Sequence, residues 1–156
     1  MNELEVVQAD LSNKVHSEAL VTLCDQYARD PMGMDEELGD QIKDTLAEEL
    51  RNFPTTVCFL AFLDGNAVGL ANGFYGFSTF KGKRLINIHD LAVLPESRGY
   101  GVGEALLQAV ESKARKMGCC KVTLEVREDN RARGLYERFG FTYGNPKLFF
   151  MTKELG

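Results

Sequence analysis

The sequence predicts an α/β fold of the α+β kind, with one domain over residues 1–156 and a mixed, mostly antiparallel sheet flanked by helices. Strand-like and helix-like segments follow the order strand, two helices, three strands, helix, strand, helix, two strands, so we expect about seven strands and about four helices. The turn Asp64-Gly65-Asn66 between two β-rich runs is typical of a hairpin. Between residues 84 and 126, a strand, a glycine-rich loop, a helix and a strand indicate a right-handed crossover with parallel strands.

The first part of the chain supplies one strand and two helices. Residues 4–10 form a short β-rich run. From Ser17, apolar residues recur at helical spacing, and Pro31 ends that pattern. A second helix is predicted by one apolar stripe, which consists of Leu38, Ile42, Leu46 and Leu50.

The rest of the chain is richer in strands. The hairpin spans residues 56–78, and a further strand covers 84–93 and ends before Pro95. A helix begins near Gly103 and ends at Gly118, because glycine readily takes the left-handed conformation that closes a helix. The remaining predicted elements are a strand at 121–126, a short helix at 134–138, and final strands at 141–143 and 147–153.

Composition narrows the function. A net charge of −5 disfavours a nucleic-acid-binding protein, which needs a basic face. The chain has no apolar run long enough to span a bilayer and no basic-then-apolar leader, so we expect a cytoplasmic protein without a membrane partner. With two histidines and four cysteines that form no CxxC pair, we expect no metal site and reduced cysteines that serve packing.

The glycine-rich stretch ESRGYGVGEALL, residues 96–107, predicts a phosphate site. Gly99, Gly101 and Gly103 come directly before a helix-forming run. A helix N-terminus carries unpaired N–H groups and a partial positive charge, and glycines let a phosphate approach the backbone closely. Arg98 adds a fixed cation with several donors. The stretch is therefore suited to hold a pyrophosphate.

Two common phosphate loops do not fit this spacing. The Rossmann fingerprint GxGxxG requires a third glycine where this chain has Glu104. The P-loop requires a lysine followed by Ser or Thr, and no such pair follows here. A dinucleotide-binding redox domain is thus disfavoured.

The spacing Arg98-x-x-Gly101-x-Gly103 resembles the phosphate motif of the GNAT superfamily of acyl-CoA-dependent N-acetyltransferases. DLAVLPESRGYGVGEALL is similar to that family's fourth strand, loop and third helix, and NRARGLYERFGF to its Asn, Leu-Tyr and Gly-Phe signature. The resemblance covers nearly the whole chain. It implies a GNAT fold with a splayed parallel strand pair at the centre of the sheet. Residues 73–93 are also similar to members that acetylate di- and polyamines.

The resemblance implies acetyl-CoA as co-substrate and assigns its contacts. The backbone of Leu91, Ala92 and Val93 would bind pantetheine, with an N–H near Leu91 or Ala92 holding the thioester oxygen. Asn130 would contact CoA, although counting back from Tyr136 by the usual family spacing reaches Asp129. The pyrophosphate would be surrounded by Arg98, Gly99, Tyr100, Gly101, Val102, Gly103 and Glu104.

For the chemistry, the resemblance makes Tyr136 the acid that protonates the leaving thiolate. An acceptor ammonium must also lose a proton, so one base is needed. His89 and Asp90 end the strand beside the thioester, and adjacent strand residues face opposite sides, so we expect only one to point at the acceptor. His89 is favoured, since an ordinary pKa of about 6.5 suits a base acting directly or through water.

Two functions remain open at this point. The first is an enzyme that acetylates a primary amine, with a small cationic amine favoured by the acidic run of Asp35, Glu36, Glu37, Asp40 and Asp44. Such a run is more often a solvated helix face than a site that attracts cations. The second is a non-catalytic acyl-CoA-binding sensor or partner module of the same fold. Many relatives are dimers, which makes a homodimer a further expectation, although no stretch identifies an interface.

Overall fold

The computed structural model describes residues 2–156. Its elements, in chain order, are β1 (Leu4–Gln8), α1 (Lys14–Arg29), α2 (Asp40–Asn52), β2 (Thr56–Leu63), β3 (Asn66–Ser78), β4 (Lys83–Val93), the 3₁₀-helix η1 (Pro95–Ser97), α3 (Val102–Lys116), β5 (Val122–Leu124) and α4 (Arg133–Arg138). The predicted order of strands and helices up to residue 138 is confirmed, and η1 is an addition.

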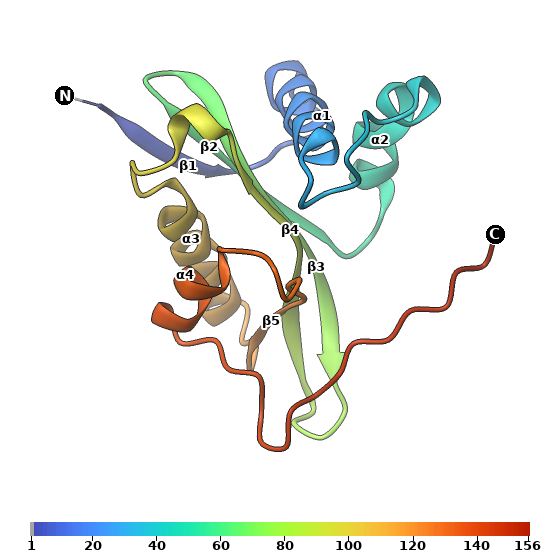
Figure 1. The fold of residues 1–156 in the computed structure, drawn as a ribbon, viewed down its shortest axis with the longest axis vertical. Coiled ribbons are helices and arrows are strands. Elements are labelled where there is room, and N and C mark those ends of the chain that lie inside the picture. The colour runs from blue at the N-terminus through green and yellow to red at the C-terminus, as the bar shows by residue number, and fades with distance from the viewer. Residues whose placement is uncertain (1) are drawn as a thin grey trace.

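One sheet with strand order β1-β2-β3-β4-β5 organises the molecule. The pairs β1–β2, β2–β3 and β3–β4 are antiparallel, and β4–β5 is parallel, as the crossover predicts. Figure 1 shows α1 and α2 on one side of the sheet and α3 with α4 on the other. Each side has its own core, since Leu106 and Leu107 of α3 are buried against one face and Leu20 and Leu23 of α1 against the other.

Local sequence explains several boundaries. Asp64 and Gly65 both have positive φ, at 52° and 83°, which is what a two-residue hairpin turn requires. Asn13 caps α1, because its side chain accepts hydrogen bonds from the N–H groups of Val15 and His16. Gly118 follows α3 at φ 72° and permits the chain to reverse.

The sheet has five strands rather than about seven. The predicted strands at 141–143 and 147–153 are not formed, and β5 is shorter than expected. As a result, the parallel pair β4–β5 lies at the edge of the sheet and not at its centre. A strand pattern becomes a strand only where a pairing edge is within reach, and the segment after Tyr143 runs away from the body (Figure 1).

Candidate active site

The centre of the site is the gap where β4 and β5 separate. The two strands pair only from Ile86 to Ile88 against Val122 to Leu124, whereas β4 continues to Val93. Residues 90–93 therefore pair with β3 on one side and have no strand neighbour on the β5 side. Their backbone on that side is available to an extended ligand.

A small cavity of about 70 Å³ lies in this gap. It unites four of the predicted site residues, His89, Leu91, Asn130 and Tyr136, which come from β4, from the loop before α4 and from α4 itself. The other side chains around it are Tyr27, Met32, Ile88, Leu124, Glu125, Val126 and Arg127. Ala92 instead packs toward the α1-side core and Val93 toward the α3-side core.

The glycine loop has the backbone geometry that the phosphate prediction needs. Gly99 and Gly101 have φ of 88° and 78°, values that favour glycine. Gly101 is the N-cap of α3 and offers no side-chain cap, so the first N–H groups of the helix have no intrahelical partner. No heavy atom lies within 4 Å of the place where a Cβ on Gly101 would sit. These features fit the pyrophosphate of acetyl-CoA.

Gly103 has a different role in this loop. A Cβ at this position would stand 3.0 Å from Cδ2 of Leu135 on α4. The glycine therefore permits close packing of α3 on α4. Val102 is buried beneath the loop, while Tyr100 and Glu104 are exposed beside it.

Arg98 is positioned by a residue that sequence reasoning missed. Its guanidinium lies 3.6 Å from a carboxylate oxygen of Asp30, the C-cap residue of α1. Both side chains are partly exposed, so the ion pair is weak and a phosphate can compete for the arginine. No sequence signal connects residues 68 positions apart.

Tyr136 is buried in α4 beside the cavity. Burial, assisted by nearby Tyr27, raises the pKa of Tyr136 to about 12. The phenol therefore stays protonated at neutral pH. Its ring also contacts Phe141 edge-on, with centroids 6.0 Å apart. The side chain is thus a packed, protonated phenol beside the cavity.

A β-bulge changes the expected orientation of His89 and Asp90. On β3, Asn72 pairs with Asp90 and Gly73 pairs with Ile88, so His89 is an extra residue without a cross-strand partner. The bulge shifts the alternation of β4 by one residue at this point.

The shift places both side chains on the α1/α2 side of the sheet. Ile88 and Leu91, three residues apart, both pack into the α3-side core. Of the two residues between them, His89 lies edge-on to Phe74 with ring centroids 6.0 Å apart. Asp90 accepts a hydrogen bond from Asn72, whose side chain also contacts Cys24 of α1. The expectation that the two side chains face opposite sides of the sheet is therefore wrong, because it assumed an unbroken strand.

Asn72 connects Asp90 to α1. Its Nδ2 donates to Oδ2 of Asp90 at 3.0 Å and to Sγ of Cys24 at 3.3 Å. The side chain of Asn72 is buried, and its Oδ1 has no hydrogen-bond partner within residues 2–156. A buried carboxamide on an apolar strand fixes the rotamer of Asp90. In the sequence, the only sign of this role is that Asn72 is a polar residue within the apolar run of β3.

The two cysteines nearest the site have raised pKa values. Burial raises the pKa of Cys24 to about 12, and Asp90 adds to that rise. Burial likewise raises the pKa of Cys58 to about 11. All four cysteines are free, as expected. Since the thiolate is the reactive form, neither thiol is suited to carry an acyl group at neutral pH.

Arg127 closes the cavity on the β5 side. Its Nη1 donates to the carbonyl of Pro31 at 3.0 Å, and its other nitrogens hold Asp129 at 2.9 and 3.0 Å. The loop after α1 is thereby tied across the gap to the segment after β5. Tyr27, whose pKa is raised by burial and by Asp90, lies under this loop.

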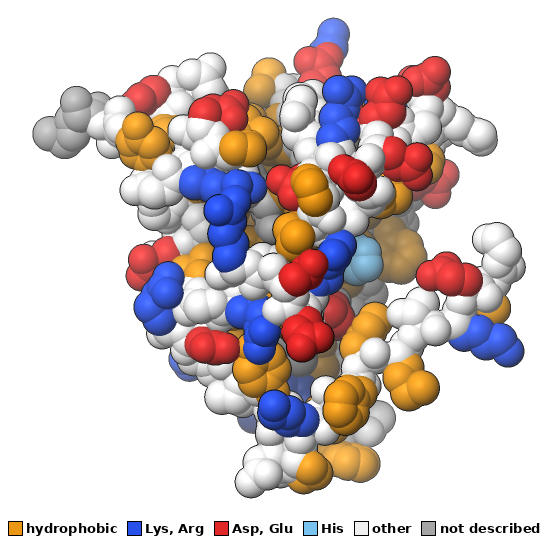
Figure 2. All heavy atoms as spheres, viewed as in Figure 1, with side chains coloured by type: hydrophobic (Ala, Val, Ile, Leu, Met, Phe, Trp, Pro, Cys, Tyr) orange, Lys and Arg blue, Asp and Glu red, His pale blue; other side chains and the backbone are white. Residues whose placement is uncertain are grey.

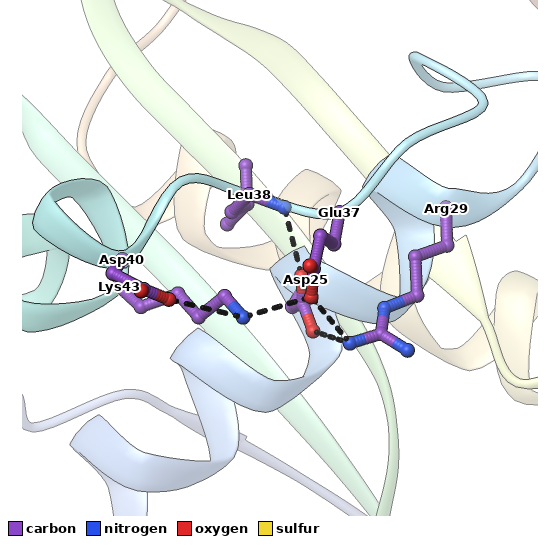
Figure 3. Close-up of polar contacts among 6 residues, drawn as sticks. All are labelled: Asp25, Arg29, Glu37, Leu38, Asp40 and Lys43. Carbon is purple, nitrogen blue, oxygen red and sulfur yellow. Dashed lines mark hydrogen bonds and ion pairs between the residues drawn. The ribbon is translucent and has the colours of Figure 1, made fainter.

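The connection from α1 to α2 is fixed by an ion-pair network (Figure 3). Arg29 bridges Asp25 and Glu37 at 2.9 and 3.1 Å, and Lys43 contacts Glu37 at 3.2 Å. The N–H of Leu38 donates to Asp25, which lowers the pKa of that carboxyl. Part of the predicted acidic run is therefore neutralised locally.

Other acids remain on the surface of this side. Figure 2 shows acidic side chains gathered over α1 and α2. Asp35, Glu36 and Asp44 are exposed. They leave a negative surface beside the loop that covers the cavity.

Asn130 shapes the turn before α4. Its Oδ1 accepts a hydrogen bond from the N–H of Ala132 at 2.8 Å, and its carbonyl accepts one from Arg133 at 3.2 Å. The residue also borders the cavity.

Among the described residues, no group of three or more His, Cys, Asp or Glu could hold a metal ion. Within residues 2–156, no helix is long and apolar enough to cross a membrane.

Comparison with known proteins decides the family. Residues 19–141 match the profile described as the acetyltransferase (GNAT) family. The chain belongs to the acetyltransferase (GNAT) family. This confirms the predicted family. It also confirms the prediction of an N-acetyltransferase that uses acetyl-CoA as co-substrate.

Solved structures share the fold of this GNAT protein at low sequence identity. A probable acetyltransferase has a TM-score of 0.83 and 22% identity, covering 97% of this chain and 99% of that one. The aminoglycoside N-acetyltransferase AAC(6')-Iy in complex with CoA has a TM-score of 0.77 and 21% identity, and the match covers 98% of this chain and 97% of that one. The ribosomal-protein-alanine N-acetyltransferase from Brucella melitensis biovar Abortus 2308 has a TM-score of 0.76 and 20% identity, and the match covers 97% of this chain and 100% of that one.

Proposed function

We propose that this GNAT protein transfers the acetyl group of acetyl-CoA to the primary amino group of a small cationic amine, such as a polyamine or a lysine-like compound. The observation that carries the proposal is the cavity where β4 and β5 separate. His89 and Tyr136 both line this cavity, and β4 leads from it into the loop before the uncapped N-terminus of α3. Acetyl-CoA supplies the acetyl thioester as co-substrate.

The residues divide the work between the two substrates. The loop from Arg98 to Glu104 binds the pyrophosphate through backbone N–H groups and the guanidinium. The backbone of residues 91–93, unpaired on the β5 side, binds pantetheine, and an N–H there stabilises the negative charge that develops on the thioester oxygen. Asn130 orients the turn that leads to Tyr136.

Proton transfer needs one base and one acid. His89 borders the cavity and accepts the proton of the acceptor ammonium, directly or through water, so that the neutral amine forms the new C–N bond. As the C–S bond breaks, Tyr136 donates its phenolic proton to the thiolate. Asp90, held by Asn72, provides negative charge beside the acceptor. The high pKa values of Cys24 and Cys58 support direct transfer without an acyl-cysteine.

The preference for a cationic amine rests on charge. Glu125 lines the cavity, Asp90 follows His89 on β4, and Asp35 and Glu36 are exposed on the loop after α1. The net charge of −5 has the same sign. Negative potential raises the local concentration of a cation, and the effect weakens as salt shortens the screening length from about 10 Å at 0.1 M.

The test is thiol release from acetyl-CoA with a panel of amines. We expect diamines and lysine-like amines to react faster than neutral or anionic amines, with kcat/KM falling as ionic strength rises. The double reversal Asp35→Lys/Glu36→Lys should flatten this salt dependence. Glu3→Lys/Glu5→Lys, the same charge change just before and within β1 at the opposite edge of the sheet, should not. Faster acetylation of neutral or anionic amines would rule out the preference for a cationic acceptor, while the assignment as an acetyltransferase would stand.

A further inference from the structure

Tyr27 borders the cavity but has no role in the proposed reaction. It lies on α1, two residues before the end of that helix, and its side chain lines the cavity together with His89 and Tyr136. Tyr136 belongs to α4, on the opposite side of the sheet from α1 (Figure 1). The phenol of Tyr27 therefore reaches the gap between β4 and β5 from the α1 side.

The backbone around Tyr27 is held firmly. The loop after α1 folds back on the last turn of the helix, where the carbonyl of Tyr27 accepts a hydrogen bond from the N–H of Asp30 at 3.1 Å. A Cβ on Gly33 would overlap that carbonyl oxygen, so the close approach of the loop requires glycine. Arg127 ties the same loop to the far side of the cavity through the carbonyl of Pro31. The backbone that carries the Tyr27 ring is thereby fixed beside the cavity.

The hydroxyl of Tyr27 is uncommitted. Within residues 2–156 it forms no hydrogen bond. Burial, followed by the carboxylates of Asp90 and Asp30, raises the pKa of Tyr27, and the guanidinium of Arg127 opposes that rise. The phenol is therefore protonated at neutral pH, and its hydrogen is available to a partner in the cavity.

Tyr27 lies between the acceptor side of the site and the acid. The charge of Asp90 affects the pKa of Tyr27, and Tyr27 in turn affects the pKa of Tyr136. Such electrostatic effects weaken with distance, so the phenol of Tyr27 is near both groups. His89 borders the same cavity of about 70 Å³. Three side chains that can carry a proton, those of His89, Tyr27 and Tyr136, thus share one small space.

The acid must regain its proton in every cycle. In the proposed reaction, on which this inference rests, Tyr136 gives its proton to the leaving thiolate and is left as a phenolate. Its side chain is only 7% exposed, and the thioester and the acceptor occupy the cavity beside it during turnover, so solvent has no direct path to it. A proton that the acceptor has lost lies meanwhile on His89, which is exposed.

We propose that Tyr27 carries this proton from the base to the acid. The O–H bond of Tyr27 breaks as its proton passes to the phenolate oxygen of Tyr136. The imidazolium of His89 then gives a proton to the Tyr27 oxygen, directly or through water, and all three groups return to their starting states. An acceptor ammonium loses two protons as it becomes an amide. One replaces the proton given to the CoA sulfur, and the other leaves His89 for solvent.

The direction of this transfer is favourable. An imidazolium is a much stronger acid than a phenol, so the step from His89 to a Tyr27 phenolate runs downhill. Burial raises the pKa of both phenols, that of Tyr136 to about 12. Because both pKa values shift in the same direction, proton transfer between the two phenols costs little free energy.

The test is stopped-flow measurement of thiol release from acetyl-CoA by the full chain and by Tyr27→Phe, with the fastest amine of the panel at saturation. In Tyr27→Phe, the first turnover uses the proton already on Tyr136 and should keep the wild-type rate. Later turnovers should be slower by roughly 10-fold or more, because Tyr136 regains its proton more slowly. Imidazolium buffer, a small external proton donor, should accelerate this slow phase and leave the wild type unchanged.

The matched control is Tyr75→Phe. Tyr75 is also a half-buried tyrosine whose pKa is raised by burial, but it lies on β3 outside the cavity. Its variant should show the wild-type rate in every turnover and no response to imidazolium.

Three results for Tyr27→Phe would overturn the relay. The first is wild-type kcat, since solvent would then supply the acid. The second is a raised KM for the amine with unchanged kcat, since Tyr27 would then only bind the acceptor. The third is a slow first turnover without rescue by imidazolium, since the hydroxyl would then only shape the site.

Tyr136→Phe, measured in parallel, separates this inference from the proposed function. A slow Tyr136→Phe beside a normal Tyr27→Phe would rule out the relay alone. A fully active Tyr136→Phe would rule out the acid and the relay together.

Discussion

The glycine loop beyond β4 and the acceptor side of β4 are near each other in the sequence, yet they are built differently. The loop from Arg98 to Glu104 takes its geometry from its own backbone, through positive φ at Gly99 and Gly101 and the start of α3. The acceptor side requires three separate elements. Asp90 is held by Asn72 of β3, which also contacts Cys24 of α1.

This difference sets how each part responds to change. A contiguous loop fails when one backbone position is altered, because no other element can supply the same N–H groups. A distributed site loses one contribution at a time, since each side chain is positioned by different neighbours. Substitutions in the loop should therefore abolish binding, and those on the acceptor side should lower rates in steps.

The largest effect is expected at Gly101. Gly101→Val places a branched side chain in the open space before α3 at φ 78°, so CoA binding measured by calorimetry should be lost. Gly118→Val is the control, because Gly118 has φ 72° and equally open surroundings at the other end of α3. If both variants lost stability alike and both still bound CoA, the phosphate assignment would be wrong.

Tyr136→Phe should lower kcat by about 10²-fold with little change in the affinity for acetyl-CoA, as is typical of a lost general acid. In the wild type, burial keeps the phenol protonated, so kcat should show no alkaline decline below about pH 10, the ordinary tyrosine value. Phe141→Leu, which removes the ring packed on Tyr136, serves as the control for packing. Equal losses in the two variants would make Tyr136 a packing residue.

Substitutions of His89 and Asp90 should affect different kinetic parameters. His89→Gln should lower kcat by about 10²-fold, as expected for a lost base. Asp90→Asn should weaken binding of cationic amines with a smaller change in kcat, because its charge attracts the substrate without taking the proton. The reverse pattern in kcat and binding would assign the base to Asp90.

The smallest effect concerns Asp30, which links the two regions. Asp30→Asn removes a negative charge 3.6 Å from Arg98 but keeps the oxygen that accepts from Met32, so CoA should bind a few-fold more tightly. A partly exposed ion pair contributes about 0–1 kcal/mol, or roughly fivefold at most. Asp40→Asn, on a fully exposed carboxylate, is the control. Weaker CoA binding by Asp30→Asn would contradict this competition.

Sequence alone determined the parts of the molecule that depend on neighbouring residues. The hairpin at Asp64-Gly65, the apolar stripes of α1 and α3, and the Arg98-x-x-Gly101-x-Gly103 loop were all predicted, and their geometry follows from local conformational preference and hydrophobic periodicity. The family followed from the same contiguous motifs.

Tertiary structure decided what depends on distant partners. The bulge at His89 arises from the register of β4 on β3, and periodicity within one strand carries no information about it. Asn72, Asp30 and Arg127 reach the site because folding joins elements far apart in the chain. The segment at 147–153 has the side chains of a strand, but strand formation requires a pairing edge.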